Sequence, residues 1–159
     1  MLNHPFPPFF DESSTVLILG SFPSVRSREE GFFYGHPQNR FWRVLVGVFA
    51  EQEVPQTIEQ KKLFLTRHHI ALWDVAAACE IDGSADSTLR EVVGNDLSII
   101  LDSAPIKRIY LNGKAAERYY HKLIEPTVGR EAIALPSTSP ANATWSLERL
   151  TEAWCVIKA

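Results

Sequence analysis

Four short, continuous apolar runs stand out along the chain, and each of them predicts a buried strand. They are residues 15–20 (TVLILG), 70–75 (IALWDV), 108–113 (RIYLNG) and 132–136 (AIALP). Strands of a parallel sheet that is covered on both faces have this continuous apolar character, without a strict alternation of apolar and polar positions. The pattern therefore predicts a four-stranded sheet with both faces buried.

Apolar positions at helical spacing lie between these runs and after the last of them. They predict helices over residues 41–49, 58–65, 97–101, 114–124 and 147–157. Strands that alternate with helices in one chain form a parallel sheet with helices packed on both sides. We therefore expect an α/β fold, a three-layer α/β/α sandwich around a central four-stranded parallel sheet.

Length and composition restrict the class of protein further. The 159 residues predict one domain, 1–159, and the 45% hydrophobic and 22% charged residues are close to the globular average. No apolar run approaches the roughly 18 residues of a membrane span, and the N-terminal MLNHPFPPFF lacks the basic segment of a secretory signal. Two cysteines, Cys79 and Cys155, cannot build a disulfide framework, so we expect a reducing location, the cytoplasm or nucleoid of a bacterial-type cell.

Charge is distributed unevenly around a small total of −3. Residues 74–102 carry seven acidic side chains against one arginine, whereas residues 20–45 and 105–122 each carry more bases than acids. The total argues against a generic basic coat for nucleic acid, but the two basic segments are compatible with a local anion site.

Polar and turn-forming residues follow the predicted strands at the points where the strands end. These ends read GSFPS at 20–24, Asp74, Asn112 followed by Gly113, and PSTSP at 136–140. In open parallel sheets, ligands bind beyond the carboxyl ends of the strands. We therefore expect the functional site at this edge. We expect no metal there, because no set of His, Cys, Asp and Glu has the spacing of a metal site.

The segment 20–42 joins the first strand to the first helix, and each of its polar features has two interpretations. It is neither a P-loop nor a dinucleotide fingerprint, so it is either an ordinary connection or a turn whose backbone amides face an anion. Asn39 either caps the following helix or uses its amide to hold a water or a base edge. Tyr34 and Phe33 are either core aromatics or a stacking platform for a flat base.

Later positions are equally open. Asp74 either caps the AAAC segment that follows it or faces a ligand, and Asn112 before Gly113 is typical of a turn. The stretch 135–145, LPSTSPANATW, is a stiff loop that either caps the last helix or meets a ligand. The chain has no G-x-S-x-G motif, and nothing in it indicates a Ser-His-Asp triad.

Taken in order, LILGSFPS, YGHPQNRFW, LWDV, LNGKAA and LPSTSPANA resemble the motifs of the uracil-DNA glycosylase superfamily. The resemblance covers residues 15–157 and is closest to the superfamily's hypoxanthine-DNA glycosylase (deoxyinosine) family. The mismatch-specific uracil and thymine glycosylases share a stretch similar to residues 36–42, HPQNRFW. The resemblance implies the superfamily's α/β/α fold and DNA as the substrate.

The chain departs from these relatives at informative places. The mismatch-specific enzymes hold the attacking water with an asparagine in their first motif, and the matching residue here is Phe22. In the hypoxanthine family the asparagine of the HPQN stretch is the catalytic one, and it corresponds to Asn39. Asp74 stands where other members read the base with an asparagine. One branch carries an iron–sulfur cluster on four cysteines, and two cysteines exclude it, so we expect no cofactor.

The resemblance implies three tasks, which are to stack and read a flipped base, to place a water, and to fill the gap in the duplex. Asn39 is the expected catalytic residue, and the expected base pocket consists of Phe22, Tyr34, Asp74 and Asn112. The expected DNA contacts, with Pro140 as a possible apolar wedge, are Ser21, Ser24, Arg26, Arg28, Ser137, Thr138, Ser139, Pro140 and Asn142. If Asp74 faces the base, either burial keeps it protonated or it accepts one hydrogen bond while other donors serve O6.

The expected function is hydrolysis of the N-glycosidic bond of a deaminated base, foremost hypoxanthine, in double- or single-stranded DNA. The product is an abasic site. A lyase that nicks the strand needs an amine in its pocket, and we expect Lys114, the lysine near a strand end, outside the start of a helix. We therefore expect a monofunctional enzyme, and a monomer. The alternatives are a mismatch-specific uracil or thymine glycosylase, a hydrolase of free nucleosides, and a nucleic-acid-binding domain without catalysis.

Overall fold

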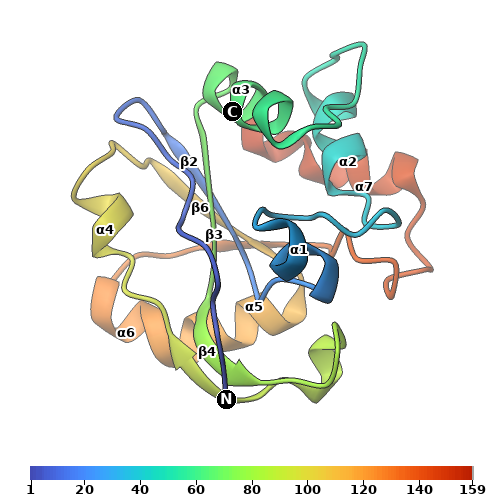
Figure 1. Cartoon of the computed structure of the whole chain (residues 1–159). Coiled ribbons are helices and arrows are strands. Elements are labelled where there is room, and N and C mark those ends of the chain that lie inside the picture. Colours follow the sequence, from blue (N-terminus) through green and yellow to red (C-terminus); the bar gives the residue numbers. More distant parts are fainter. Residues whose placement is uncertain (159) are drawn as a thin grey trace.

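The structure is a computed structural model that describes residues 1–158 (Figure 1). Its centre is a four-stranded parallel sheet in the order β3-β2-β6-β7. The strands are β2 (Val16–Gly20), β3 (Ile70–Asp74), β6 (Arg108–Asn112) and β7 (Ile133–Leu135). All four predicted strands are confirmed, apart from their end residues.

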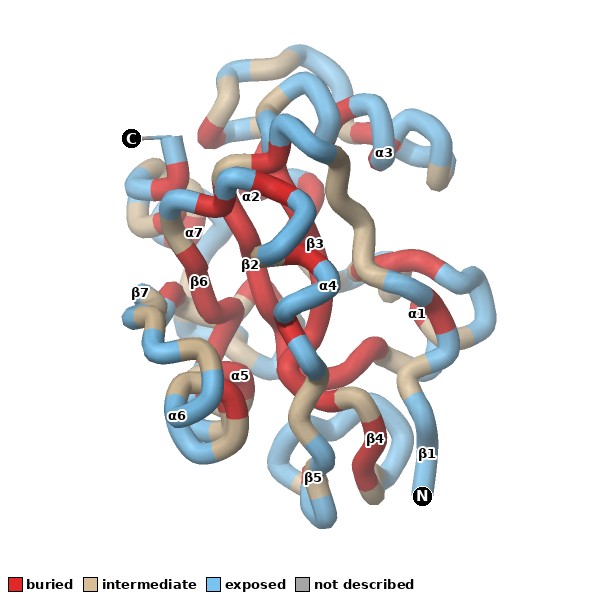
Figure 2. The backbone as a smooth tube through the Cα atoms, turned by 90° about the vertical axis from the view of Figure 1, so that its left-hand side faces the viewer, coloured by how far each residue is buried: buried red, intermediate tan, exposed pale blue. Residues whose placement is uncertain are grey.

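The apolar runs become the buried middle of the molecule. In β2, Leu17, Ile18 and Leu19 have no exposed surface, and β3 is buried along its whole length. Figure 2 shows β2, β3 and β6 as a buried centre surrounded by more exposed segments. A sheet with apolar side chains on both faces is stable only when other elements cover both faces.

Helices provide this cover on both sides of the sheet (Figure 1). On one side lie α1 (Val25–Glu30), α2 (Phe41–Val48), α3 (Ile58–Arg67) and α7 (Leu147–Trp154), which ends in a 3-10 turn at Cys155–Lys158. On the other lie α4 (Ser98–Leu101), α5 (Lys114–Tyr119) and α6 (Glu125–Val128), with a π-helical turn at Tyr120–Ile124 between the last two. The right-handed connections of parallel strands account for this division. The predicted three-layer sandwich is confirmed.

A second, antiparallel sheet lies outside the sequence prediction. β4 (Ala76–Glu80) pairs with β1 (Leu2–Asn3) on one side and with β5 (Arg90–Gly94) on the other. A loop with a 3-10 turn at Asp86–Thr88 joins β4 to β5. The AAAC residues after Asp74 are therefore part of a strand, and the interpretation that Asp74 caps this segment is wrong.

The N-terminal segment covers the free edge of β3. Phe9 and Leu72 exchange backbone hydrogen bonds of 3.0 and 2.9 Å, and the N–H of His4 donates to the carbonyl of Ala77 at 2.8 Å. Phe6 packs edge-on against Phe33, with 4.8 Å between the ring centroids. Since an open strand edge can pair with another chain, this segment protects the sheet. It also brings His4 to the end of β3.

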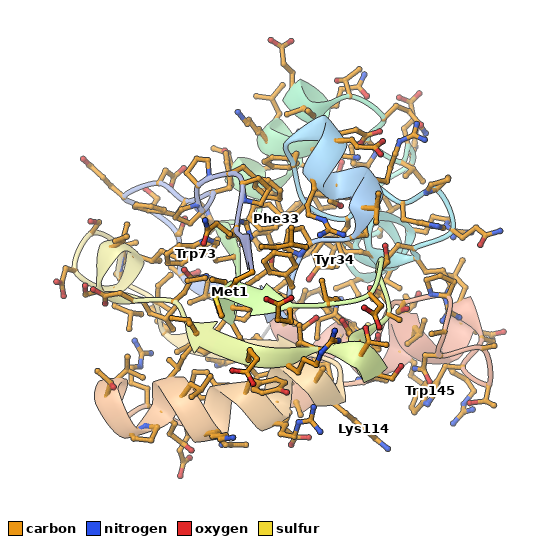
Figure 3. All side chains as sticks on the ribbon, turned by 60° about the horizontal axis from the view of Figure 1, so that its bottom comes forward. Met1, Phe33, Tyr34, Trp73, Lys114 and Trp145 are labelled. Atoms are coloured by element: carbon orange, nitrogen blue, oxygen red, sulfur yellow. The ribbon has the colours of Figure 1, made fainter. Side chains whose placement is uncertain are left out.

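The helices of the molecule are short. The longest, α3, has ten residues, and within residues 1–158 no helix is long and apolar enough to cross a membrane. Lys114 is exposed at the start of α5, as expected, and Figure 3 shows its side chain directed away from the protein.

The packing of the N-terminal segment leads to a stability prediction. Phe6→Ala should lower the free energy of unfolding by roughly 3–5 kcal/mol, because it removes a buried aromatic ring from the core. Leu2→Ala, at an exposed position of the same segment, should change it by less than about 0.5 kcal/mol. Urea unfolding followed by circular dichroism measures both. Equal midpoints for the two variants would show that the segment does not contribute to the core.

Candidate active site

A cavity of about 330 Å³ opens at the carboxyl ends of β2, β3 and β6. Gly20 and Asp74 are register partners on neighbouring strands, and Leu19 pairs with Leu111, so the residues after these strands meet at one edge. The predicted residues that line the cavity are Ser21, Phe22, Ser24, Tyr34, Asn39, Asp74, Asn112, Ser137, Thr138, Ser139 and Pro140. The structure therefore brings together all the predicted residues except Arg26, Arg28 and Asn142, which lie outside the lining.

A directed chain of hydrogen bonds joins three segments of this cavity. Asn112 Nδ2 donates to Thr138 Oγ1 at 3.0 Å, and the N–H of Thr138 donates to Asn112 Oδ1 at 3.1 Å. The Thr138 hydroxyl accepts from Asn112 and gives its own proton to Asn39 Oδ1 at 2.8 Å. The backbone N–H of Phe41 donates to the same oxygen at 2.9 Å. Asn112, which was expected in the base pocket, thus lines the cavity with its amide paired to Thr138.

This chain of bonds fixes the direction in which the Asn39 amide faces. Its oxygen is occupied by two donors, so the Nδ2 group is the part that remains for a ligand. The capping interpretation of Asn39 is confirmed in part, because the bond to Phe41 supports the first residue of α2. The N-cap position itself is Arg40, whose side chain makes no capping bond. Asn39 therefore presents a hydrogen-bond donor to the cavity.

Arg40 fastens the loop between β7 and α7. Its guanidinium donates to the carbonyls of Ser139 (3.0 Å), Asn142 (3.1 Å) and Trp145, and its backbone N–H donates to the carbonyl of Thr138 (3.0 Å). Three carbonyls on one planar cation hold the loop in one shape, with Pro140 exposed on it. Arg40 was not among the predicted site residues, although it stands next to Asn39 in the HPQNRFW stretch.

Asp74 lies deep in the cavity with 3% of its surface exposed. Its Oδ2 is 2.8 Å from His4 Nε2, and His4 Nδ1 faces the N–H of Phe6 at 3.5 Å, which assigns the ring proton to Nε2. A Cβ on Gly20 would lie 2.5 Å from Asp74 Oδ1. The absence of a side chain at Gly20 therefore gives room to Oδ1, the carboxylate oxygen that His4 does not hold. No sequence signal marked His4 as part of the site.

Tyr34 forms one wall of the cavity. Its ring stacks on Phe41 with 3.9 Å between the centroids and 17° between the planes, so only its other face can meet a ligand. Its φ of 54° lies in the left-handed region, which bulky residues rarely adopt. The hydroxyl is buried and has no hydrogen-bond partner within residues 1–158. Burial, together with the charge of Asp74, raises the pKa of Tyr34 far above its ordinary value, so the phenol stays neutral.

The loop between β4 and β5 forms a wall that the sequence analysis did not anticipate, with Ser84, Ala85 and Asp86 in the lining. Three hydrogen bonds fasten it to the 21–28 segment: Ser21 Oγ donates to Asp86 Oδ1 (2.8 Å), the N–H of Val25 to Ser84 Oγ (2.9 Å), and Arg28 Nη2 to the carbonyl of Gly83 (2.8 Å). The protein atoms around the Asp86 carboxyl group partly shield it from water, which raises its pKa. The negative charge of Asp74 also raises this pKa, whereas the hydrogen bond from Ser21 lowers it. In the sequence Asp86 is one acid among several in residues 74–102, and no motif distinguishes it.

Three of the residues expected to contact DNA, Ser24, Arg26 and Arg28, make contacts within the protein. Ser24 is the N-cap of α1 and accepts from the N–H of Ser27 at 3.1 Å. Arg26 pairs with Glu30 at 2.8 Å on the surface, and Arg28 lies over the ring of Phe22, 5.5 Å from its centroid. Their contact with DNA stays a prediction.

Nearly the whole chain is similar to known proteins of one family. The family model described as "Uracil DNA glycosylase superfamily" matches residues 7–158. A hypoxanthine DNA glycosylase of Methanosarcina barkeri is 36% identical over 155 residues, 97% of this chain and 96% of that protein. One of Methanosarcina acetivorans is 36% identical over 156 residues, 96% of each chain.

A solved structure extends the comparison to the fold. The solution NMR structure of a Methanosarcina acetivorans protein, described as a candidate uracil DNA glycosylase, matches with a TM-score of 0.82 and 34% sequence identity. The match covers 99% of this chain and 98% of that chain. These similarities confirm the resemblance found in the motifs. The chain belongs to the uracil DNA glycosylase superfamily.

Proposed function

We propose that this DNA glycosylase hydrolyses the N-glycosidic bond of hypoxanthine in DNA and leaves an abasic site. The observation that carries the proposal is that one cavity presents a fixed donor, Asn39 Nδ2, and a fixed acceptor, Asp74 Oδ1. Two relatives that are 36% identical over nearly their full length are named hypoxanthine DNA glycosylases, which supports the same substrate. We further propose that the chain acts as a monomer.

The deep acceptor suits a deaminated base. The N1–H group of hypoxanthine can donate a hydrogen bond to the Asp74 carboxylate, whereas adenine has a lone pair at N1 that the carboxylate repels. The base must leave the duplex to reach Asp74, because the glycosidic bond is hidden in the stack. The free face of Tyr34 then offers a surface for the flipped ring to stack on.

Asn39 acts in this proposal on the departing base. A neutral amide cannot remove a proton from water at neutral pH, and the Asn39 oxygen is already occupied. When the C1′–N9 bond breaks, its electron pair leaves on the purine, and the Nδ2 group donates a hydrogen bond to that developing charge. A donor placed where charge develops lowers the barrier of the reaction more than it strengthens ground-state binding.

The loop that Arg40 fastens is suited to hold the opened duplex. Pro140 is exposed, and the carbonyls on either side of it are fixed by the Arg40 guanidinium. A rigid apolar group can enter the space that a flipped nucleotide leaves. This loop favours a DNA substrate over a free nucleoside, for which no gap needs to be filled.

A glycosylase assay tests the proposed function directly. Duplex oligonucleotides that carry one inosine, uracil or xanthine are incubated with the protein and then treated with alkali, which breaks the strand at abasic sites. We expect cleavage at inosine to be fastest and an unmodified duplex to stay intact. Release of base from free deoxyinosine but not from DNA would identify a nucleoside hydrolase, and cleavage at uracil alone would identify the mismatch-specific alternative.

Asn39 provides the first prediction for this function. Asn39→Asp keeps the oxygen that accepts from Phe41 and Thr138 but replaces the Nδ2 donor by a second oxygen. The rate of hypoxanthine release should fall by about 10²–10³-fold, while the melting temperature changes little. Asn39→Ala should lose the same activity and, in addition, about 1 kcal/mol of stability, because Phe41 loses its capping bond. An Asn39→Asp enzyme with normal turnover would show that Asn39 is only a cap.

Asp74 provides a prediction about base preference. The charge of a departing uracil spreads onto the carbonyls beside its N3–H, close to Asp74, whereas in hypoxanthine much of it stays on the imidazole ring. Asp74→Asn removes the repulsion and should raise activity on uracil relative to hypoxanthine by about tenfold, the scale of one hydrogen bond. Asp102→Asn, the same substitution at an exposed position, serves as the matched control for the loss of one negative charge. If the ratio of the single-turnover rates on uracil and hypoxanthine stays unchanged, Asp74 has a structural role and does not select the base.

The loop provides a third prediction. Replacing Ser139 and Pro140 by glycine removes the apolar group and loosens the turn, so duplex substrates should lose far more activity than single-stranded ones. The comparison is made with one inosine oligonucleotide, alone and annealed to its complement. Equal losses on the two substrates would contradict the wedge.

A further inference from the structure

Hydrolysis needs an acceptor that holds the attacking water, and most acceptors in the cavity are already occupied. The oxygen of Asn39 takes two donors, and that of Asn112 takes the N–H of Thr138. His36 Nδ1 accepts from the N–H of Gln38 at 3.1 Å, so its other ring nitrogen carries the proton. Phe22 offers no acceptor at all. The hydroxyl groups of the lining, such as that of Tyr34, are neutral and poor bases, whereas a carboxylate can both hold a water and take its proton.

Two carboxylates line the cavity, and each has one oxygen engaged. Asp74 Oδ2 is held by His4, and Asp86 Oδ1 accepts from Ser21. They differ in depth, because Asp74 is buried whereas Asp86 lies exposed on the β4–β5 loop. A flipped base enters the cavity first, and its sugar stays near the surface, tied to the DNA backbone. The sugar carbon that water must attack is therefore expected near the mouth of the cavity, where Asp86 lies.

We propose that Asp86 is the catalytic carboxylate that orients and deprotonates the attacking water. This inference rests on the proposed function. Ser21, whose hydroxyl binds Asp86, directly precedes Phe22 in the chain. The Asp86 carboxylate, on a loop distant in sequence, thus lies beside the segment of Phe22, the residue whose side chain cannot hold a water.

The step balances in atoms and charge. As the C1′–N9 bond breaks, its electron pair leaves on the base, and the sugar becomes oxocarbenium-like. The water oxygen bonds to C1′ and one of its protons passes to Asp86, which returns the proton through solvent to the base anion. The negative carboxylate also stabilises the positive sugar before water is added.

The loop that carries Asp86 is held firmly enough to position a water. The donors of its three hydrogen bonds to the 21–28 segment are the hydroxyl of Ser21, the backbone N–H of Val25 and the guanidinium of Arg28. The raised pKa of Asp86 makes its carboxylate a stronger base than an ordinary aspartate. Both properties favour proton transfer from a water at the mouth of the cavity.

The test separates the charge of Asp86 from its structural bond. Asp86→Asn keeps an oxygen that can accept from Ser21 but loses the negative charge, whereas Asp86→Ala loses both. Asp82→Asn is the control on the same loop, since Asp82 is exposed, pairs with Arg90 and lies outside the cavity. Single-turnover rates are measured on an inosine duplex. Binding is measured on a duplex with 2′-fluoro-deoxyinosine, which resists cleavage.

We expect Asp86→Asn to slow hypoxanthine release by at least about 100-fold while binding stays equal or tightens, because a negative charge near the phosphates is gone. Formate should restore part of the rate of Asp86→Ala, and Asp82→Asn should behave as the wild type. A merely structural role would instead weaken binding and show no formate rescue, which would overturn the inference. An active wild type with an equally active Asp86→Asn overturns the inference alone, and an inactive wild type overturns the proposed function as well.

Discussion

The candidate site depends on the buried hydroxyl of Thr138. It accepts from Asn112 at the end of β6 and donates to Asn39, two residues before α2, while its own backbone belongs to the loop after β7. A hydroxyl has one proton to donate. Because the Thr138 proton goes to the Asn39 oxygen, the Asn112 group that meets the same hydroxyl must be the donor, Nδ2. A side chain of the same shape without the oxygen would leave the Nδ2 group of Asn112 without this partner, at about 1–3 kcal/mol for a buried group, and would leave the Asn39 oxygen with Phe41 as its donor. One oxygen atom thus links the position of the loop, which Arg40 fastens, to the orientation of Asn39.

The central sheet could be predicted because its strands are continuous apolar runs, and strands of that kind fit few other structures. The position of the cavity followed from the general rule that ligands bind beyond the carboxyl ends of parallel strands. β4 and β5 escaped prediction for a physical reason. The small residues of Ala76–Glu80 show little periodicity, and Arg90–Gly94 is largely exposed. These strands form because β4 pairs with β5 and with β1 of the N-terminal segment. Pairing between distant segments cannot be predicted from the pattern of residues within each strand.

The motifs led to Asn39, Tyr34, Asp74 and Thr138 but not to three groups that fix other parts of the site, His4, Asp86 and Arg40. His4 is 70 positions from Asp74, Asp86 is 65 from Ser21, and Arg40 is 105 from Trp145. Each of these pairs depends on which loops come together after the sheet has formed. The family resemblance therefore supplied candidate residues, whereas the geometry was needed to show which of their atoms remain free.

The cavity is completed from both ends of the chain. His4, within the first ten residues, holds Asp74, and Trp154, in the last helix, donates from its indole to the carbonyl of Pro136 at the base of the loop, at 2.9 Å. Segments near chain ends open more readily than a central sheet. A ligand that binds only when both segments are closed binds more tightly the larger the closed population is. By the same linkage, its binding protects the two segments from opening. Hydrogen exchange at the two termini is thereby coupled to occupancy of a pocket that lies between them, even where neither terminus meets the ligand.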